Sequence, residues 1–349
     1  MIYINGRFLT QPMTGVERYA YSICRALVDL QQSFVIVCPH ADIQPCYDTS
    51  NMQIIRYGIG NSHFWEQCVL PFFFVGKKDY IVLSFTGLGS ILIRNKIMTV
   101  HDLSFLFNRS WFSKAYYWWY KLMTPLAIKS SKAIITVSQY SKQEILRFYP
   151  FIQEDKISVI YGAIDNDRFY IKKVASPNAD RFALAVSSLD PRKNFPMLIK
   201  AFKGIEGCQL LIVGKHNRVF SEQENEQSDN IRFLGRVSDD ELLRLYNQAE
   251  CLIFPSIYEG FGLPLLEAMA CECPVLASDI PVFKEVCGEA AVYFNPHDQK
   301  NIHDTIIQYL NSPAKEKETM REKGLQMIKR FSWTDSAKRI ILLANTYIK

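Results

Sequence analysis

Short apolar runs alternate with longer amphipathic segments along the first half of the chain. Residues 15–30 carry apolar side chains at helical spacing, which predicts an amphipathic helix. The shorter runs are rich in β-branched residues and have the length of strands. Strands are therefore expected at residues 1–5, 33–38, 81–85, 96–100 and 133–137. Strands that alternate with helices predict a doubly wound parallel sheet, so the fold class is α/β.

The second half of the chain repeats this plan. A polar connector at residues 172–180 separates the halves, and a last helix is expected from Ser332 to about Tyr347. A chain of 349 residues is long for one core and natural for two domains. Strands are expected at residues 182–187, 209–213, 231–234, 251–254 and 274–277.

Composition indicates a globular protein, with 48% hydrophobic and 21% charged residues. Asn5, Gly6 and Arg7 interrupt the first apolar run, so no signal peptide is expected, and the other apolar runs are too short to span a membrane. The nine cysteines include no CxxC pair and most sit in apolar contexts, which favours reduced core residues over disulfides or zinc. We expect a cytoplasmic protein, either free or on the inner face of the cytoplasmic membrane.

Positive charge and aromatic residues concentrate in the first half. Residues 1–174 contain 19 Lys and Arg against 12 Asp and Glu, and the remainder contains 21 against 23. The densest patch, residues 111–121, combines lysines with tyrosines and tryptophans. Such a patch suits an anionic membrane interface, and it equally suits a helix packed into the core of the first domain. Neither the charge nor any motif supports nucleic-acid binding.

The most informative stretch lies at residues 251–270. An apolar strand ends at Pro255, glycines follow, and Pro264 suits the first turn of a helix. A strand, a glycine loop and a helix N-terminus form an anion site. Two carboxylates, Glu259 and Glu267, flank this site, which indicates binding of a nucleotide sugar.

The segment Glu-Gly-Phe-Gly-Leu-Pro-Leu-Leu-Glu, beginning at Glu259, resembles the Glu-x7-Glu motif of retaining glycosyltransferases of family 4. This resemblance implies the GT-B fold, with two Rossmann-like domains facing an interdomain cleft. It implies an acceptor-binding domain at residues 1–172, a nucleotide-sugar domain at 173–331, and a final helix at 332–349 that crosses back to the first domain.

Further motifs resemble the same family. His101 and Asp102 follow a strand as His-Asp-Leu; in the family this histidine lines the donor sugar, while Asp102 would orient the loop or a helix start. Gly15 and Arg18 open the first long helix, where family members contact donor phosphate or acceptor. We expect His101 and Glu259 to be catalytic, and Arg18 and Asp102 to lie on the first-domain side of the cleft.

The remaining donor contacts are also implied by the resemblance. Arg192 and Lys193 are cations suited to the departing diphosphate. The chain departs from the commonest pattern, because Ser187 stands where many members have an arginine, and the resemblance implies that Arg192 replaces that charge. Glu267 would hold the ribose. The other donor-binding residues expected are Gly15, Ser187, Gly214, Lys215, Arg236, Val237, Phe261, Gly262 and Leu263.

No cofactor is expected. Asp165-Asn166-Asp167 reads as the Asp-x-Asp metal motif of another glycosyltransferase fold, but its position favours a turn, and cations with a helix dipole would neutralise the phosphates without a metal. The motifs, together with Phe64-Trp65-Glu66-Gln67, look like those of bacterial O-antigen or capsule mannosyltransferases. We expect hexose transfer from GDP-mannose, or from a UDP- or dTDP-sugar, to a lipid-linked glycan. A sugar-nucleotide epimerase, a phosphorylase and a non-catalytic sugar-nucleotide binder remain alternatives.

Overall fold

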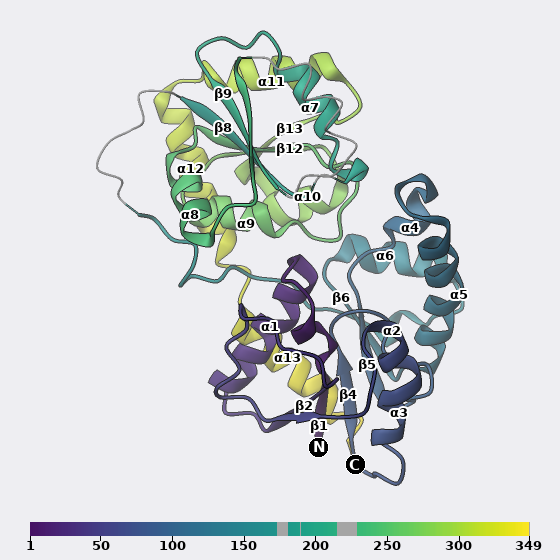
Figure 1. Cartoon of the computed structure of the whole chain (residues 1–349). Coiled ribbons are helices and arrows are strands. Elements are labelled where there is room, and N and C mark those ends of the chain that lie inside the picture. The colour runs from purple at the N-terminus through teal and green to yellow at the C-terminus, as the bar shows by residue number, and fades with distance from the viewer. Residues whose placement is uncertain (173–180, 189, 215–228, 349) are drawn as a thin grey trace. The chain divides into compact units, whose positions relative to one another are not determined.

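The computed structural model describes residues 1–172, 181–188, 190–214 and 229–348, and it forms two compact units (Figure 1). The first unit consists of Met1–Gly162 with Ser332–Lys349, and the second of Ala163–Phe331. The first unit thus ends at Gly162, before the expected boundary at residue 172. Residues 173–180 of the expected connector lie outside the described residues.

The first unit is built on a seven-stranded sheet in which every neighbouring pair is parallel, in the order β3-β2-β1-β4-β5-β6-β7. The five strands predicted from apolar runs are present. The edge strands β3 and β7 were not predicted, because each has three residues and offers little pattern. The strands are β1 (Ile2–Asn5), β2 (Phe34–Cys38), β3 (Ile54–Arg56), β4 (Ile81–Ser84), β5 (Lys96–Val100), β6 (Ala133–Thr136) and β7 (Ile157–Val159).

Helices of the first unit begin where the sequence supplies caps. Ser113 and Ser138 accept a hydrogen bond from the backbone at the starts of α5 and α6, as serine commonly does at an N-cap. A single π-helical turn, Trp65–Val69, joins α2 to α3. The helices are α1 (Gly15–Asp29), α2 (Ser62–Phe64), α3 (Leu70–Phe73), α4 (Ser104–Phe107), α5 (Lys114–Ser130), α6 (Gln139–Phe148) and α13 (Trp333–Asn345).

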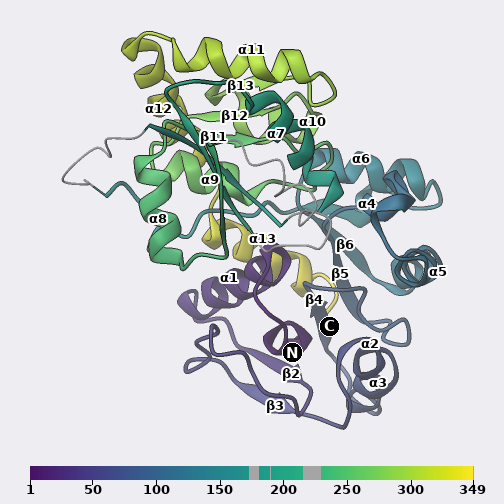
Figure 2. The same cartoon turned by 45° about the horizontal axis from the view of Figure 1, so that its top comes forward.

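The last helix, α13, packs on the first helix, α1, and the two lie side by side in Figures 1 and 2. Ala337, Ile340 and Ala344 are fully buried in this contact region. The Tyr19 ring meets the Trp333 ring edge to face at 5.6 Å. The Ser336 hydroxyl donates to the Tyr161 carbonyl over 2.8 Å, so the C-terminal helix completes the core of the first unit.

The second unit contains a six-stranded sheet, again parallel throughout, in the order β10-β9-β8-β11-β12-β13. All five predicted strands are present. The edge strand β13 was not predicted, and three of its four residues are only half buried. The strands are β8 (Phe182–Val186), β9 (Gln209–Val213), β10 (Ile231–Gly235), β11 (Cys251–Phe254), β12 (Val275–Ser278) and β13 (Ala291–Phe294).

Helices cover both faces of this second sheet. On one face α7 and α11 pack together over a core that includes Phe195, Ile253 and Ile302; on the other, α9 packs against α8 and α12 (Figures 1 and 2). The two Rossmann-like units confirm the expected fold class. The helices are α7 (Phe195–Phe202), α8 (Asp239–Gln248), α9 (Leu263–Ala270), α10 (Pro281–Cys287), α11 (Gln299–Leu310) and α12 (Ala314–Ile328).

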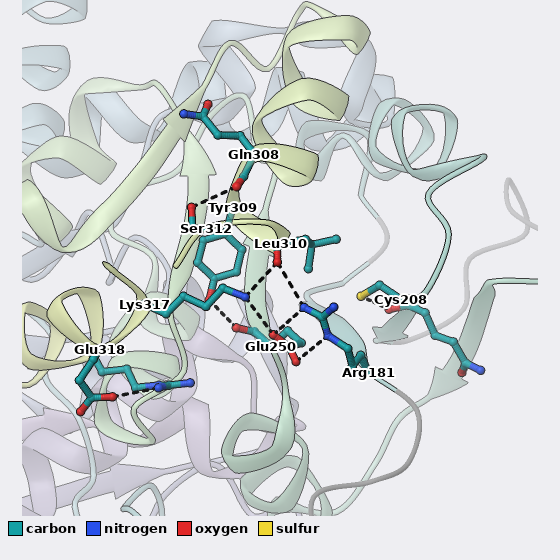
Figure 3. Close-up of polar contacts among 11 residues, drawn as sticks. Arg181, Cys208, Glu250, Gln308, Tyr309, Leu310, Ser312, Lys317 and Glu318 are labelled. Atoms are coloured by element: carbon teal, nitrogen blue, oxygen red, sulfur yellow. Dashed lines mark hydrogen bonds and ion pairs between the residues drawn. The ribbon is translucent and has the colours of Figure 1, made fainter. Parts of the chain in front are cut away.

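A polar network fastens the edge of the second unit where β8 and β11 begin (Figure 3). The Arg181 guanidinium bonds both carboxylate oxygens of Glu250, at 3.0 and 3.3 Å. Lys317 reaches the same carboxylate at 3.5 Å, and both cations donate to the Leu310 carbonyl at the end of α11. Cations suit a helix C-terminus, so the network binds two strands and two helices at the amino-terminal edge of the sheet.

The opposite, carboxyl-terminal edges of the two sheets are where ligands bind in open parallel sheets. The loops after β1, β4 and β5 in the first unit, and after β8, β9, β10 and β11 in the second, carry the residues singled out from the sequence. In the described part of the chain, no helix combines the length and the apolar character that crossing a membrane requires.

Candidate active site

The loop after β11 brings Glu259 against the two cations that follow β8. The Glu259 carboxylate pairs with the Lys193 ammonium through Oε1 and with Arg192 Nη1 through Oε2, the latter at 3.3 Å. The Ser256 hydroxyl donates to Oε1 over 2.9 Å. Ile257 N also donates to the Arg192 carbonyl, which joins the two loops through their backbones. Three residues expected in the site therefore form one group.

This group is buried, which sets its electrostatics. Lys193 and Glu259 are 8% and 7% exposed. Burial lowers the pKa of the Lys193 ammonium, and the Glu259 carboxylate opposes that shift. Arg192 and Lys193 place two basic side chains beside one carboxylate, which suits the group to an anion with more than one negative charge. A diphosphate has that chemistry.

The helix α9 begins beside this group, and Gly262 makes the turn possible. Its φ of 105° lies in the left-handed region that favours glycine, and an added Cβ would stand 2.9 Å from Leu265 Cδ1. The Phe261 ring packs edge to face on Phe331 at 5.5 Å. Leu263 is the first residue of the helix, which presents its N-terminal backbone amides at the positive end of the dipole.

Glu267 lies on α9 and has a buried partner that the sequence did not reveal. The Tyr246 hydroxyl, on α8, donates to Glu267 Oε2 over 3.0 Å, and Tyr246 is fully buried. Burial and the Glu267 charge hold the pKa of Tyr246 far above its ordinary value, so it stays a donor. In the sequence, Tyr246 looks like any core aromatic of an amphipathic helix, and no local signal distinguishes it.

Replacing Tyr246 with phenylalanine is expected to weaken nucleotide binding about tenfold. The substitution keeps the ring in the core but removes the hydroxyl that orients the Glu267 carboxylate, and a hydrogen bond to a charged group contributes about 1.5–3 kcal/mol. Calorimetric titration with GDP measures the effect. Tyr309→Phe is the matched control, since its hydroxyl donates to the Glu250 carbonyl at the opposite edge of the sheet. Equal affinities in the two variants would contradict a positioning role.

The remaining donor-binding candidates lie at the ends of β8, β9 and β10. Ser187 and Gly214 are in direct contact: a Cβ on Gly214 would stand 1.8 Å from the Ser187 carbonyl oxygen, so only glycine fits. Gly214 N donates to the Gly235 carbonyl over 2.9 Å, and Arg236 and Val237 follow directly. Arg236 is exposed and Val237 half buried. Lys215 lies outside the described residues.

In the first unit, His101 lies at the end of β5. Its Nε2 is 2.7 Å from the Phe85 carbonyl at the end of β4, and its ring meets Tyr19 edge to face at 5.1 Å. Burial lowers the pKa of His101, and the bond to the carbonyl partly opposes this. A neutral ring that donates Nε2–H to Phe85 keeps Nδ1 as an acceptor, able to receive a hydrogen bond from a hydroxyl.

The other first-unit candidates are positioned by α1 and α4. Gly15 opens α1, and Arg18 lies in its first turn, half buried, with its N–H bonded to the Thr14 carbonyl at 2.8 Å. The Asp102 carboxylate accepts a hydrogen bond from Ser104 N over 2.9 Å at the start of α4. Asp102 therefore holds the loop that carries His101.

The Asp-x-Asp segment forms a turn, as predicted. Asp165 accepts hydrogen bonds from the backbone of Asp167 through its carboxylate and of Arg168 through its carbonyl. Within the described ranges, no three His, Cys, Asp or Glu side chains come together as a metal site.

Comparisons with known proteins agree with this architecture. Residues 13–168 match the family Glycosyltransferase Family 4, and residues 166–327 match Glycosyl transferases group 1. The chain is 38% identical over 317 residues to the O-antigen chain mannosyltransferase RfbU of Salmonella typhimurium, covering 84% of this chain and 86% of that one. It is 30% identical over 290 residues to O-antigen chain mannosyltransferase B of Escherichia coli, covering 76% and 74%.

Solved structures share the fold at low sequence identity. The sucrose-phosphate synthase of Thermosynechococcus elongatus superposes with a TM-score of 0.79 at 19% identity, covering 99% of this chain and 98% of that one. The Anabaena protein HepE, solved with UDP-glucose, gives 0.76 at 16% identity and covers 99% of both chains. Two family models match the chain, and its similarity to the two mannosyltransferases extends over most of each protein. The chain therefore belongs to the group 1 and family 4 glycosyltransferases.

Proposed function

We propose that this glycosyltransferase moves mannose from GDP-mannose, with retention of anomeric configuration, to a growing lipid-linked surface glycan such as an O-antigen. The observation that supports the sugar and the acceptor is the similarity to two O-antigen mannosyltransferases, one at 38% identity over most of both chains. A nucleotide sugar is the donor class, and HepE, of the same fold, was solved with one.

In this proposal the second unit binds the donor. Arg192, Lys193 and the amides that begin α9 stabilise the diphosphate as it leaves, so the reaction needs no metal ion or other cofactor. Their positive charge matters most in the transition state, when the leaving group gains charge. Glu267, oriented by Tyr246, holds the ribose hydroxyls.

The sugar end of the donor is assigned to Glu259 and His101. Glu259 accepts hydrogen bonds from the hexose or stabilises positive charge at its anomeric carbon, and His101 accepts a sugar hydroxyl at Nδ1. Retention proceeds by attack on the same face, with the leaving phosphate oxygen taking the proton from the acceptor hydroxyl. The glycosidic bond to phosphate breaks as the new bond forms.

A donor screen followed by a transfer assay tests the proposal. Protein is melted with GDP-mannose, UDP-glucose, UDP-galactose and dTDP-rhamnose; a ligand at 100 times its Kd adds about 2.7 kcal/mol. GDP-mannose should give the largest rise in Tm, and mass spectrometry should find one hexose added to an octyl glycoside, with EDTA present or absent. A larger rise with another donor would replace mannose, and loss of transfer in EDTA would require a metal.

The exposed side of α5 supports peripheral membrane contact. Trp118, Leu122 and Leu126 are 48%, 61% and 49% exposed at spacings that share one helix face. Lys121 lies over the Trp118 ring at 5.0 Å, and α5 has no acidic residue. Other aromatics of the same patch, such as Tyr117 and Tyr120, pack against the core. We propose that the exposed face lies on anionic lipid.

Vesicle sedimentation tests this contact. Wild-type protein should pellet with phosphatidylglycerol vesicles at low salt and remain in the supernatant with phosphatidylcholine, because each lysine near the surface contributes about 1 kcal/mol. Trp118→Ala with Leu122→Ala should reduce pelleting even at low salt. Leu342→Ala, which removes an exposed leucine from α13, serves as control. Wild-type protein that stays in the supernatant with both lipids would exclude the contact.

A further inference from the structure

A buried polar cluster lies at the carboxyl-terminal edge of the first sheet. We define the Glu66 cluster as Asn5, Arg7, His63, Glu66 and Gly87. Asn5 ends β1, and its Nδ2 donates to Glu66 Oε1 over 2.7 Å. Arg7 Nε lies 3.7 Å from the same oxygen. Glu66 is completely buried, and Arg7 is 8% exposed. A parallel sheet binds its ligands at this edge.

The second carboxylate oxygen of Glu66 is not satisfied. Among the residues that the structure describes, none forms a hydrogen bond with Glu66 Oε2, with Arg7 Nε or with His63 Nδ1, although all three atoms are buried. A buried charged oxygen without a partner loses its hydration and gains no bond in return, which is costly. In native proteins such an atom calls for an explanation, and a bound ligand is one.

Trp65 and Gln67, the neighbours of Glu66 in the π-helical turn, differ from it because their polar atoms are hydrogen-bonded within the protein. Trp65 Nε1 donates to the Tyr57 carbonyl at 2.7 Å. Gln67 donates to the Gly89 carbonyl and accepts from Ile91 N, at 2.8 and 3.1 Å. Both side chains are used for internal structure, whereas half of the Glu66 carboxylate is not. Single π-helical turns of this kind often occur at functional sites.

The spacing around Glu66 Oε2 matches a hydroxyl group. His63 Nδ1 and Glu66 Oε2 are 3.9 Å apart, too far to bond each other. Both atoms are buried, so the His63 ring must first move aside to admit a ligand. A hydroxyl oxygen about 2.8 Å from both atoms would then donate its proton to the carboxylate and accept one from the imidazole N–H. His63 is the accessible side of the cluster, with 35% of its side chain exposed.

Aromatic rings border the same place. The His63 ring lies 5.6 Å from Trp119 and 6.0 Å from Tyr120, and Trp119 is 36% exposed. Burial raises the pKa of Tyr120, and the Arg7 charge only partly opposes this, so the Tyr120 hydroxyl stays protonated. An aromatic wall with a few directed polar groups is the usual lining of a small-molecule site.

Gly87 connects the cluster to His101. At its φ of 67°, an added Cβ would lie 2.5 Å from Arg7 Nη2 and 3.2 Å from Glu66 Oε1, so this loop passes directly over the ion pair. Two residues earlier in the same loop, the Phe85 carbonyl bonds His101. The cluster and the histidine assigned to the reacting sugar therefore share one short loop after β4.

We propose that the Glu66 cluster binds a hydroxyl group of the acceptor's terminal sugar and thereby selects the acceptor. This inference rests on the proposed function. Glu66 Oε2 accepts the hydroxyl proton, Arg7 and His63 flank it, and Trp119 supports the apolar face of the sugar ring. A site built to bond a particular hydroxyl rejects an analogue that lacks it, because its buried polar groups are then left unpaired.

Glu66→Gln tests the inference with little change of shape. The glutamine oxygen can still accept from Asn5, while an amide replaces the unsatisfied oxygen. Kinetics are measured with GDP-mannose and octyl glycosides of mannose, galactose, rhamnose and N-acetylglucosamine. Transfer to the best acceptor should fall by ten- to a hundredfold in kcat/KM for the glycoside. Hydrolysis of GDP-mannose without acceptor, and its affinity, should stay within about twofold.

Monodeoxy analogues of the best octyl glycoside separate acceptor binding from a purely structural role of Glu66. A structural role would not make kcat/KM depend on one particular hydroxyl of the acceptor. One analogue should lose at least tenfold in kcat/KM with wild-type enzyme and lose nothing further with Glu66→Gln. His63→Gln, at a half-exposed position, gives a second variant with the same expected pattern should Glu66→Gln not fold. Glu144→Gln is the matched control, since Glu144 is also buried in this unit with one oxygen lacking a described partner.

Three results would overturn the inference. These are wild-type kinetics in Glu66→Gln, equal loss of donor hydrolysis and transfer together with a lower Tm, or wild-type tolerance of every deoxy analogue. The second of these would indicate a structural ion pair holding a water. If the wild type consumes no sugar nucleotide, the proposed function fails instead. Tryptophan fluorescence titration with the octyl glycosides then still decides whether the cluster binds sugar, through weaker binding by Glu66→Gln.

Discussion

Replacing Glu259 with glutamine is expected to lower transfer at least 100-fold while GDP binds as tightly as before or more tightly. The contacts of Glu259 explain both effects. Glu259 occupies Arg192 and Lys193, so an incoming diphosphate must displace a carboxylate from the two cations. An uncharged amide competes less, and it cannot stabilise positive charge at the anomeric carbon. A 100-fold loss corresponds to about 2.7 kcal/mol of transition-state stabilisation.

Steady-state transfer and calorimetric titration with GDP measure the two effects in the same preparation. Glu289→Gln is the control, because Glu289 is exposed in the same unit and pairs with Lys323. Near-normal transfer by Glu259→Gln would remove Glu259 from the chemistry. A tenfold loss of GDP affinity would show instead that the carboxylate organises the phosphate site.

Replacing His101 with alanine is expected to lower transfer about 100-fold with a modest loss of stability. The ring makes one hydrogen bond to the Phe85 carbonyl and one edge-to-face contact with Tyr19, together about 1–2 kcal/mol. Because burial lowers the pKa of His101 from 6.5, the ring stays neutral at somewhat lower pH than an ordinary histidine. Wild-type activity that depends on a neutral ring should therefore persist just below pH 6.5.

His303→Ala is a closely matched control for this experiment. His303 also bonds a backbone carbonyl, that of Ala201, at 2.8 Å, but it lies on α11 away from the loops of the candidate site. Both variants should lose a few degrees in Tm, and only His101→Ala should lose transfer. If the two variants lose Tm and activity in parallel, His101 is a core histidine and has no part in catalysis.

The strands were predictable where they are buried on both faces. β2, β8 and β11 bury every residue, so each appears in the sequence as a continuous apolar run. The edge strands β3, β7 and β13 have three or four residues and partly polar or half-exposed faces, which leaves no run to detect. Pairing with a neighbour, and not local pattern, makes them strands.

The candidate site was predictable as separate loops and not as a network. Glycine, proline and charged residues at the end of a strand predicted each loop. The pairing of Lys193 with Glu259 joins residues 66 positions apart, and no local pattern encodes it. The roles of Tyr246 and Glu66 could not be predicted for a related reason. In the sequence Tyr246 resembles any core tyrosine and Glu66 resembles a surface glutamate of a helix, and only tertiary packing buries Glu66.

The position of α13 has a consequence for the order of events during synthesis. Domains generally fold as units from the N-terminus while the ribosome is still adding residues. The first unit, however, buries Ala337, Ile340 and Ala344 of the last helix, and these leave the ribosome only after the whole second unit. The second unit can therefore complete its core first. The first unit must wait with an apolar face of α1 exposed, and a chain that stops short of α13 should be captured by chaperones or aggregate.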